Sequence, residues 1–179
     1  MSNELIKPHA GKLINCYCDN SKAQEYKDRA VNYSSHTLTD RQLCDLELIL
    51  NGAFSPLDGF MVQKDYNSVL DNNRLSDGNI WSIPIVLDIQ LELADSISIN
   101  DKLALRDKEG YLIAILEIND KWNYNKELEA KKVYGTTDIS HTGVRYLFEN
   151  GGDVCVGGKL IGIERPHHHD FLDIRLDPN

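Results

Sequence analysis

The stretch "TDRQLCDLELILNGAFSPLDGFM", residues 39–61, joins a strong helix signal to a run of turn residues. Thr39 and Gln42 are spaced as a capping box, in which each side chain accepts a hydrogen bond from the other's backbone N–H. Asn51 and Gly52 then form a typical helix end, because glycine tolerates the left-handed conformation. The apolar positions between these signals share one helical face: Leu43, Leu46, Ile49 and Leu50. We therefore predict a helix that begins after Thr39 and ends at Asn51.

The second half of this stretch is rich in turn residues, yet it carries four large apolar side chains. We expect Phe54 to fold back onto the helix and enter the core, and Phe60 and Met61 to turn inward as well. Leu57, at the tip beside Pro56, is then expected to stay exposed and to form a docking surface for another domain or subunit.

The two glycines of the stretch, Gly52 and Gly59, follow the helix end and Asp58 respectively. Both are predicted to serve the geometry of turns rather than the binding of a ligand.

Composition places the chain among ordinary globular proteins. Its 179 residues are 41% hydrophobic and 26% charged, and a chain of this length can bury its own core. The net charge of −9 argues against binding to a phosphate backbone, so no nucleic-acid partner is expected. No apolar run approaches the ~20 residues that span a bilayer, and "MSNELIKPHAGK" lacks the apolar centre of a secretory signal. We expect no membrane partner and a cytoplasmic location.

The four cysteines do not form the paired pattern of a zinc site: Cys16, Cys18, Cys44 and Cys155. We predict reduced, mostly buried thiols, as expected in a reducing compartment.

The remaining elements do not alternate regularly between helix and strand. Helices are predicted over residues 21–30, 62–73, 125–134 and 142–150, and strands over residues 79–89, 102–106, 111–118 and 159–163. The two middle strands form a hairpin. This order predicts the α+β class, with a mainly antiparallel sheet closed into a small mixed barrel and flanked by short helices.

The glycine-rich stretch "GGDVCVGGKL", residues 151–160, invites comparison with a phosphate-binding loop. That loop requires G-x-x-x-x-G-K-[ST], but Asp153 stands at the first glycine and Leu160 replaces the hydroxyl residue that would hold magnesium. We expect a turn that leads into a strand.

Several titratable side chains are open to structural and functional interpretations. Glu47 lies at the edge of the apolar helix face, where a carboxylate needs a partner such as an arginine or backbone donors. The alternative is a catalytic general base, but the sequence places no second titratable group near it. Asp138 and His141 lie between two glycines and form either a structural turn or a contact with a ligand or domain. The three histidines at residues 167–169 alternate in direction on an extended chain, which favours a solvated, partly stacked segment over a surface metal site.

Several long motifs, in order, resemble the N-terminal domain of ATP sulfurylase (sulfate adenylyltransferase). They are "LTDRQLCDLELILNGAFSPLDGFM", "NRLSDGNIWSIPIVLDI", "VYGTTDISHTGVRYL" and "VGGKL", with "IKPHAGKL" and "PHHHDFLDIRLDP" similar to the two ends of that domain. The resemblance covers nearly the whole chain. One difference is Thr142, which stands where the family usually has proline.

This resemblance implies a single PUA-like domain over residues 1–179. The parent enzyme transfers the adenylyl group of MgATP to sulfate, which gives adenosine 5′-phosphosulfate and pyrophosphate. In the family this chemistry lies in a following domain marked by Gln-x-Arg-Asn-Pro and His-x-x-His, and this chain contains neither motif. No catalytic, cofactor-binding or metal-binding residue is therefore assigned, and the chain alone is predicted to be inactive.

The implied partner is the catalytic domain of the same or another chain, with MgATP bound there, in an enzyme expected to be a homo-oligomer. Two alternatives remain at this point: an RNA-binding module, since PUA-like folds also occur in RNA-binding proteins, and a stand-alone regulatory subunit.

Overall fold

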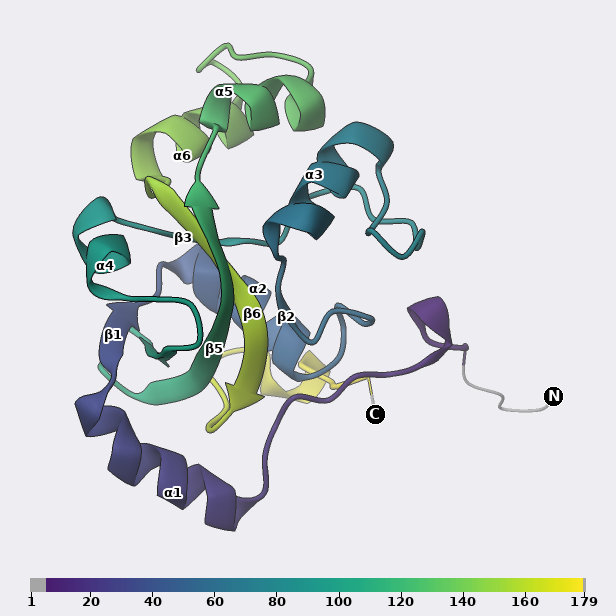
Figure 1. The fold of residues 1–179 in the computed structure, drawn as a ribbon. Helices are drawn as coiled ribbons and strands as arrows, with labels where there is room; N and C mark the ends of the chain where they lie inside the picture. Colours follow the sequence, from purple (N-terminus) through teal and green to yellow (C-terminus); the bar gives the residue numbers. More distant parts are fainter. Residues whose placement is uncertain (1–5, 179) are drawn as a thin grey trace, which may run out of the picture. The chain divides into compact units, whose positions relative to one another are not determined.

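The computed structural model describes residues 6–178, which form two compact units (Figure 1). Each unit is assembled from segments that are distant in sequence. Unit 1 takes the described residues of Met1–Gly59, Ala104–Leu116 and Leu160–Asn179, whereas unit 2 takes Phe60–Leu103 and Glu117–Lys159. The expectation of one domain over residues 1–179 stays a prediction.

The helical elements are short and are divided between the units. Unit 1 contains η1 (His9–Gly11), α1 (Asn20–Arg29), η2 (Ala30–Asn32), α2 (Asp40–Leu50) and η4 (Leu172–Ile174). Unit 2 contains α3 (Gln63–Asn72), α4 (Leu91–Ser96), α5 (Lys126–Glu129), the π-helical η3 (Ala130–Tyr134) and α6 (Thr142–Asn150).

The strands form one mainly antiparallel sheet with the order β1-β4-β5-β6-β2, and β3 pairs with β6 as well. Their bounds are β1 (Ser34–Thr37), β2 (Gly59–Phe60), β3 (Leu87–Ile89), β4 (Lys102–Arg106), β5 (Leu112–Asn123) and β6 (Val154–Gly162). The α+β class is thus confirmed. The predicted closure into a barrel is not, because strand pairing among residues 6–178 is an open path from β1 to β2.

Most predicted elements are present, but the strand predicted over residues 79–89 is largely absent. Leu87–Ile89 pairs, as β3, with Leu87 opposite Val156 and Ile89 opposite Val154. Earlier in this range, Ile80 forms an isolated antiparallel bridge with Arg74. Pro84 lies in the unpaired part, and a proline has no N–H to donate to a neighbouring strand. The hairpin of β4 and β5 is confirmed, while β5 and β6 are longer than predicted because β5 continues to Asn123 and β6 starts at Val154.

Helix α2 in unit 1 forms as predicted. The Thr39 hydroxyl accepts from the backbone N–H of Gln42 at 3.2 Å, and the Gln42 side chain accepts from the Thr39 N–H at 3.0 Å. Asn51 caps the other end, and Gly52 has φ +92°. Of the four predicted apolar positions, three are fully buried: Leu46, Ile49 and Leu50. The fourth, Leu43, is half-buried.

The turn after α2 corrects the predictions for Leu57 and Phe54. Leu57 is only 7% exposed, so it belongs to the core, whereas Phe54 is half-buried. The backbone N–H of Leu57 donates to the carbonyl of Phe54 at 2.9 Å, which returns Leu57 to the interior. The predictions that Leu57 forms an exposed docking surface and that Phe54 enters the core are therefore both wrong.

The other predictions for this stretch hold in part. Phe60 and Met61 are each 2% exposed, as predicted for inward-facing residues. The positive φ of Gly52 agrees with its role as a turn residue, while Gly59 instead begins strand β2.

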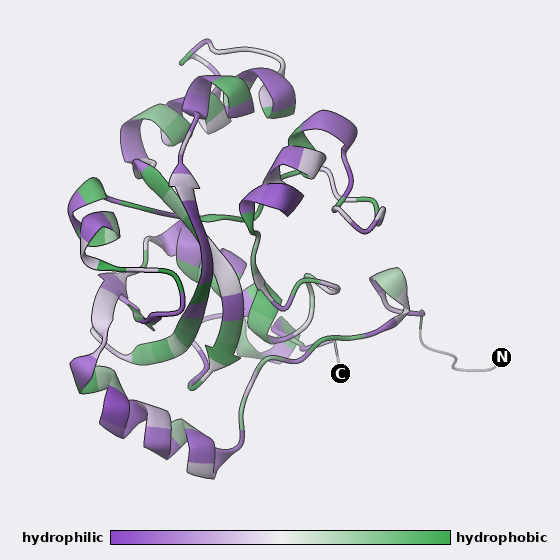
Figure 2. Cartoon of the chain, in the orientation of Figure 1, coloured by the Kyte–Doolittle hydropathy of each residue, from purple (hydrophilic) through white to green (hydrophobic). Residues whose placement is uncertain are grey.

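Apolar residues are concentrated in the central strands, while α1 is mostly hydrophilic (Figure 2). A cluster in unit 1 joins the hairpin to the region after α1, with the buried members Ala30, Ala104, Leu112 and Ile115. A cluster in unit 2 holds η3 against α6, with the buried members Ala130, Val144 and Leu147.

All four cysteines are free thiols, as predicted. The expectation that most are buried is wrong. Only Cys155 is buried, Cys16 and Cys18 are half-buried, and Cys44 is exposed on α2.

Candidate functional site

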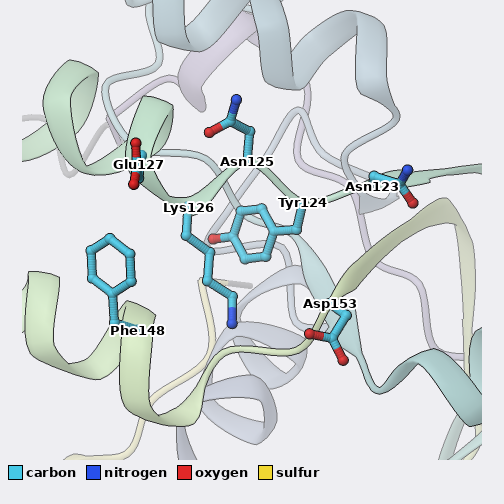
Figure 3. Close-up of a pocket in the computed structure, with 7 residues that line it drawn as sticks. All are labelled: Asn123, Tyr124, Asn125, Lys126, Glu127, Phe148 and Asp153. Carbon is cyan, nitrogen blue, oxygen red and sulfur yellow. The ribbon is translucent and has the colours of Figure 1, made fainter.

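Unit 2 contains a hollow of about 610 Å³ where β5 ends and α5 begins (Figure 3). It is lined by Asn123, Tyr124, Asn125, Lys126, Glu127, Phe148 and Asp153. The Asn125 side chain accepts from the N–H of Leu128 at 3.0 Å and so caps α5. Phe148 reaches the hollow from α6 and remains partly exposed.

Lys126 provides the cation of this hollow, and its ammonium lies between Phe148 and Asp153 in Figure 3. The Nζ atom donates to the carbonyl of Gly151 at 2.7 Å, so the charge is used to hold the turn before β6. Burial raises the pKa of the Tyr124 phenol, and the nearby Glu129 carboxylate raises it further. Tyr124 is therefore neutral at physiological pH. These groups form a polar surface hollow rather than a matched acid and base.

Tyr124 also belongs to a largely buried cluster that the sequence did not reveal. The Tyr66 ring centroid is 5.6 Å from that of Trp122 and 6.3 Å from that of Tyr124, and the Glu129 side chain is buried beside them. Burial is the main cause of the raised pKa of Tyr66, followed by the charge of Glu129. The members of this cluster come from two distant stretches of the chain, Tyr66 on α3 and residues 122–129, so no local spacing pattern could have indicated their contact.

Cys155 lies in the same unit and is inert as a nucleophile. Burial raises the pKa of its thiol, and the carboxylate of Asp88 raises it further. A thiol that stays protonated is a poor nucleophile and a poor metal ligand.

The histidine run of residues 167–169 lies in unit 1, with His167 and His169 exposed and His168 half-buried, which agrees with the predicted solvated, partly stacked segment. His168 Nε2 lies 2.8 Å and 3.0 Å from the two carboxylate oxygens of Glu47 on α2. The prediction that Glu47 needs a partner is confirmed, although the partner is a histidine rather than an arginine or backbone donor. The His167 ring stacks on Tyr111, with centroids 5.4 Å apart.

His169 contributes to a cavity of about 330 Å³ in unit 1, lined also by Leu43, Asp107, Glu109, Tyr111 and His167. The buried Asp107 carboxylate accepts from the N–H of Tyr111 at 2.8 Å and so stabilises the hairpin turn. Across residues 6–178, no group of three or more His, Cys, Asp and Glu side chains is arranged to hold a metal ion.

Asp138 and His141 form a turn in front of α6. The Asp138 carboxylate accepts from the N–H of Ser140 at 2.8 Å, and this bond lowers the pKa of Asp138. The His141 imidazole accepts from the N–H of Val144 at 3.4 Å and caps α6, while its ring packs against Tyr134 at 4.9 Å. Of the two interpretations left open by the sequence, the contacts favour the structural turn.

The glycine-rich stretch over residues 151–160 leads into strand β6 rather than into a helix. A phosphate-binding loop uses the N–H groups at a helix start, so the geometry agrees with the expected turn and strand. No helix within the described part of the chain has the length and hydrophobicity required to cross a bilayer.

Comparison with known proteins gives a consistent result. A family model described as a PUA-like domain matches residues 6–165. Sulfate adenylyltransferase from Gibberella zeae is 44% identical over 176 residues, which cover 96% of this chain and 31% of that protein. The enzyme from Schizosaccharomyces pombe is 46% identical over 157 residues, which cover 87% of this chain and 32% of that protein.

A solved structure adds the fold comparison. The alignment with the hexameric APS kinase from Thiobacillus denitrificans covers 97% of this chain and 30% of that chain, with a TM-score of 0.75 and 31% sequence identity. This chain thus spans about a third of the length of these relatives. The match of the family model over most of the chain, together with this fold, shows that the chain belongs to the PUA-like domain family.

Proposed function

We propose that this chain is the non-catalytic N-terminal domain of a sulfate adenylyltransferase, which converts ATP and sulfate into adenosine 5′-phosphosulfate and pyrophosphate. The observation that carries the proposal is the similarity to sulfate adenylyltransferases over 87% or more of the chain. The same similarity favours this function over an RNA-binding module.

The contacts of the titratable side chains support a structural role. Glu47 binds His168, the Asp138 carboxylate stabilises a turn, and the His141 imidazole caps a helix. Each of these groups, which sequence reasoning had considered for chemistry or for contacts, holds the fold of its own unit. The function of the chain is then to support and position a catalytic portion, which would bind MgATP.

The proposed partner is that catalytic portion, in the same polypeptide or in another. A homo-oligomeric enzyme is proposed as well, supported by the similarity to a hexameric APS kinase. A cytoplasmic location is proposed from the free cysteines, which suit a reducing compartment.

A pyrophosphate-release assay with MgATP and sulfate tests the proposal. The 179-residue chain should show no sulfate-dependent turnover, while the complete polypeptide encoded by its gene should show it. The same complete polypeptide without sulfate is the control for background ATP hydrolysis.

Two results would contradict the proposal: sulfate-dependent turnover by the 179-residue chain, or a complete polypeptide that releases no pyrophosphate with sulfate. A gene whose reading frame ends at Asn179 would instead favour a stand-alone regulatory subunit.

A further inference from the structure

The last part of unit 1 has an unusual surface. Four of the six side chains in segment 171–176 are large and apolar, and all are well exposed: Phe171 by 69%, Leu172 by 63%, Ile174 by 72% and Leu176 by 80%. Exposed apolar side chains that cluster along one segment mark an interaction site, whereas singly scattered ones need no explanation.

The segment is held in place by polar contacts on both sides. Before it, His168 binds Glu47 of α2 at 2.8 Å. After it, Asp177 pairs with Arg165 at 2.6 Å, and the Arg165 guanidinium lies 4.9 Å from the centroid of the Tyr17 ring. These anchors fix the ends of the segment on unit 1 while its apolar side chains remain exposed.

Contacts within the segment give it a defined shape. The N–H groups of Ile174 and Arg175 donate to the carbonyl of Phe171 at 3.0 Å and 3.2 Å. The Arg175 guanidinium also donates from Nε to the carbonyl of Asp170 at 3.2 Å. An apolar surface that is ordered before binding loses less conformational entropy when a partner covers it.

The relatives indicate what covers this surface. They match this chain over 87% or more of its length, yet the matched region is only about a third of each relative. About two thirds of each relative therefore lies outside the matched region, and this remainder is the protein available to cover the segment. Asp173 and Arg175 alternate with the apolar residues, a mixture that suits a protein surface better than a lipid surface.

We propose that segment 171–176 is the docking element through which unit 1 contacts the remaining part of a sulfate adenylyltransferase polypeptide. This inference rests on the proposed function, and it assigns to named residues the contact with the catalytic portion. The anchors at His168 and Asp177 hold the docking element in position.

The test measures cysteine accessibility in the 179-residue chain and in the complete polypeptide. Leu172→Cys and Ile174→Cys are introduced singly, and alkylation by a maleimide is followed by peptide mass spectrometry, which separates these cysteines from the native ones. Both should react at least tenfold more slowly in the complete polypeptide. Ser21→Cys, on the exposed surface of α1, is the control and should react at the same rate in both.

Equal labelling rates at residues 172 and 174 in the two proteins would overturn the inference, even if the complete polypeptide made adenosine 5′-phosphosulfate. Protection in a complete polypeptide without that activity would instead retain the docking contact and reject the proposed function. Protection that appears in the 179-residue chain alone as its concentration rises would assign the segment to contacts between copies, which also overturns the inference.

Discussion

Two irregular segments of unit 1 have similar composition and opposite burial. The turn after α2 carries Phe54 and Leu57 beside a proline, and segment 171–176 carries four large apolar residues near the end of the chain. Leu57 is 7% exposed, whereas Leu172 is 63% exposed. Apolar side chains on an irregular backbone are therefore not sufficient to place that backbone in the core.

The difference lies in how the backbone polar groups are satisfied. In the turn, the N–H of Phe54 donates to Leu48, and that of Ser55 to Gly52, at 2.9 Å and 3.0 Å. The buried Ser55 hydroxyl also donates to the Gly52 carbonyl at 2.6 Å and accepts from the N–H of Ile14 at 2.8 Å. A turn whose polar groups are paired in this way can enter the core without a large desolvation cost.

Segment 171–176 also has internal backbone hydrogen bonds, from the N–H groups of Ile174 and Arg175 to the carbonyl of Phe171, and its margins are anchored by His168 and Asp177. Its apolar side chains thus remain available for a partner. The turn differs in that it also bonds to Leu48 on α2 and to Ile14, and these bonds hold it against other segments of unit 1.

The largest expected effect comes from placing a charge in each segment. Leu57→Asp should lower the free energy of unfolding by roughly 4 kcal/mol, because it removes a buried side chain and leaves a carboxylate in the core. Leu172→Asp should change it by less than about 0.5 kcal/mol, as expected for an exposed position. Urea denaturation of both variants of the 179-residue chain measures the difference. Similar losses in the two variants would refute the contrast in burial.

A smaller effect is expected from the glycine that starts the turn. Gly52 has φ +92°, and a Cβ there would lie 2.5 Å from the carbonyl oxygen of Ile14. Gly52→Val should therefore cost roughly 3 kcal/mol, from the left-handed conformation and the steric clash together.

Gly110 is the matched control, since it has the same φ of +92° and a Cβ added there would meet no atom within 4 Å. Gly110→Val should cost only the conformational part, roughly 1–2 kcal/mol. Thermal denaturation of the two variants compares them. An equal loss in stability would show that the contact with Ile14 contributes nothing.

The smallest effect concerns the anchor of the exposed segment. A hydrogen bond from Arg165 lowers the pKa of Asp177 below its ordinary value of 3.8. A lowered pKa in the folded state means that the stabilisation is fully present above that ordinary value and is lost as the pH falls through the lowered pKa. Because the pair is partly exposed, the contribution should be about 0.5 kcal/mol.

Asp177→Asn should therefore reduce stability slightly at pH 6, and the difference from the unmodified chain should shrink as the pH falls below 3.8. Urea denaturation across this pH range measures it, with Asp173→Asn, at an exposed aspartate of the same segment, as the control. A difference that grows on acidification would contradict the assignment.

The sequence predicted the local elements well where the signals were local. The capping box at Thr39, the helix end at Gly52 and the hairpin of β4 and β5 depend on residues that are neighbours along the chain. The prediction of a full strand over residues 79–89 was wrong, because a high content of apolar and β-branched residues does not show whether a neighbouring strand is available for pairing.

For the candidate site residues as well, the sequence indicated local features but not contacts between distant residues. Sequence reasoning recognised that Glu47 needs a partner, but it did not find His168, which lies 121 positions away. The buried Glu129 cluster gave no sequence signal, because Tyr66 meets Trp122 and Tyr124 only through tertiary packing.

The sequence by itself determined the α+β class, the helix over Asp40–Leu50 with both of its ends, and, through extended motifs, the resemblance to sulfate adenylyltransferases. Only the tertiary structure decided that Leu57 is buried and that Leu172 is exposed. The physical reason is that periodicity and capping act between neighbours along the chain, whereas burial depends on hydrogen-bond partners and packing surfaces supplied by distant segments, such as Ile14 for the turn after α2.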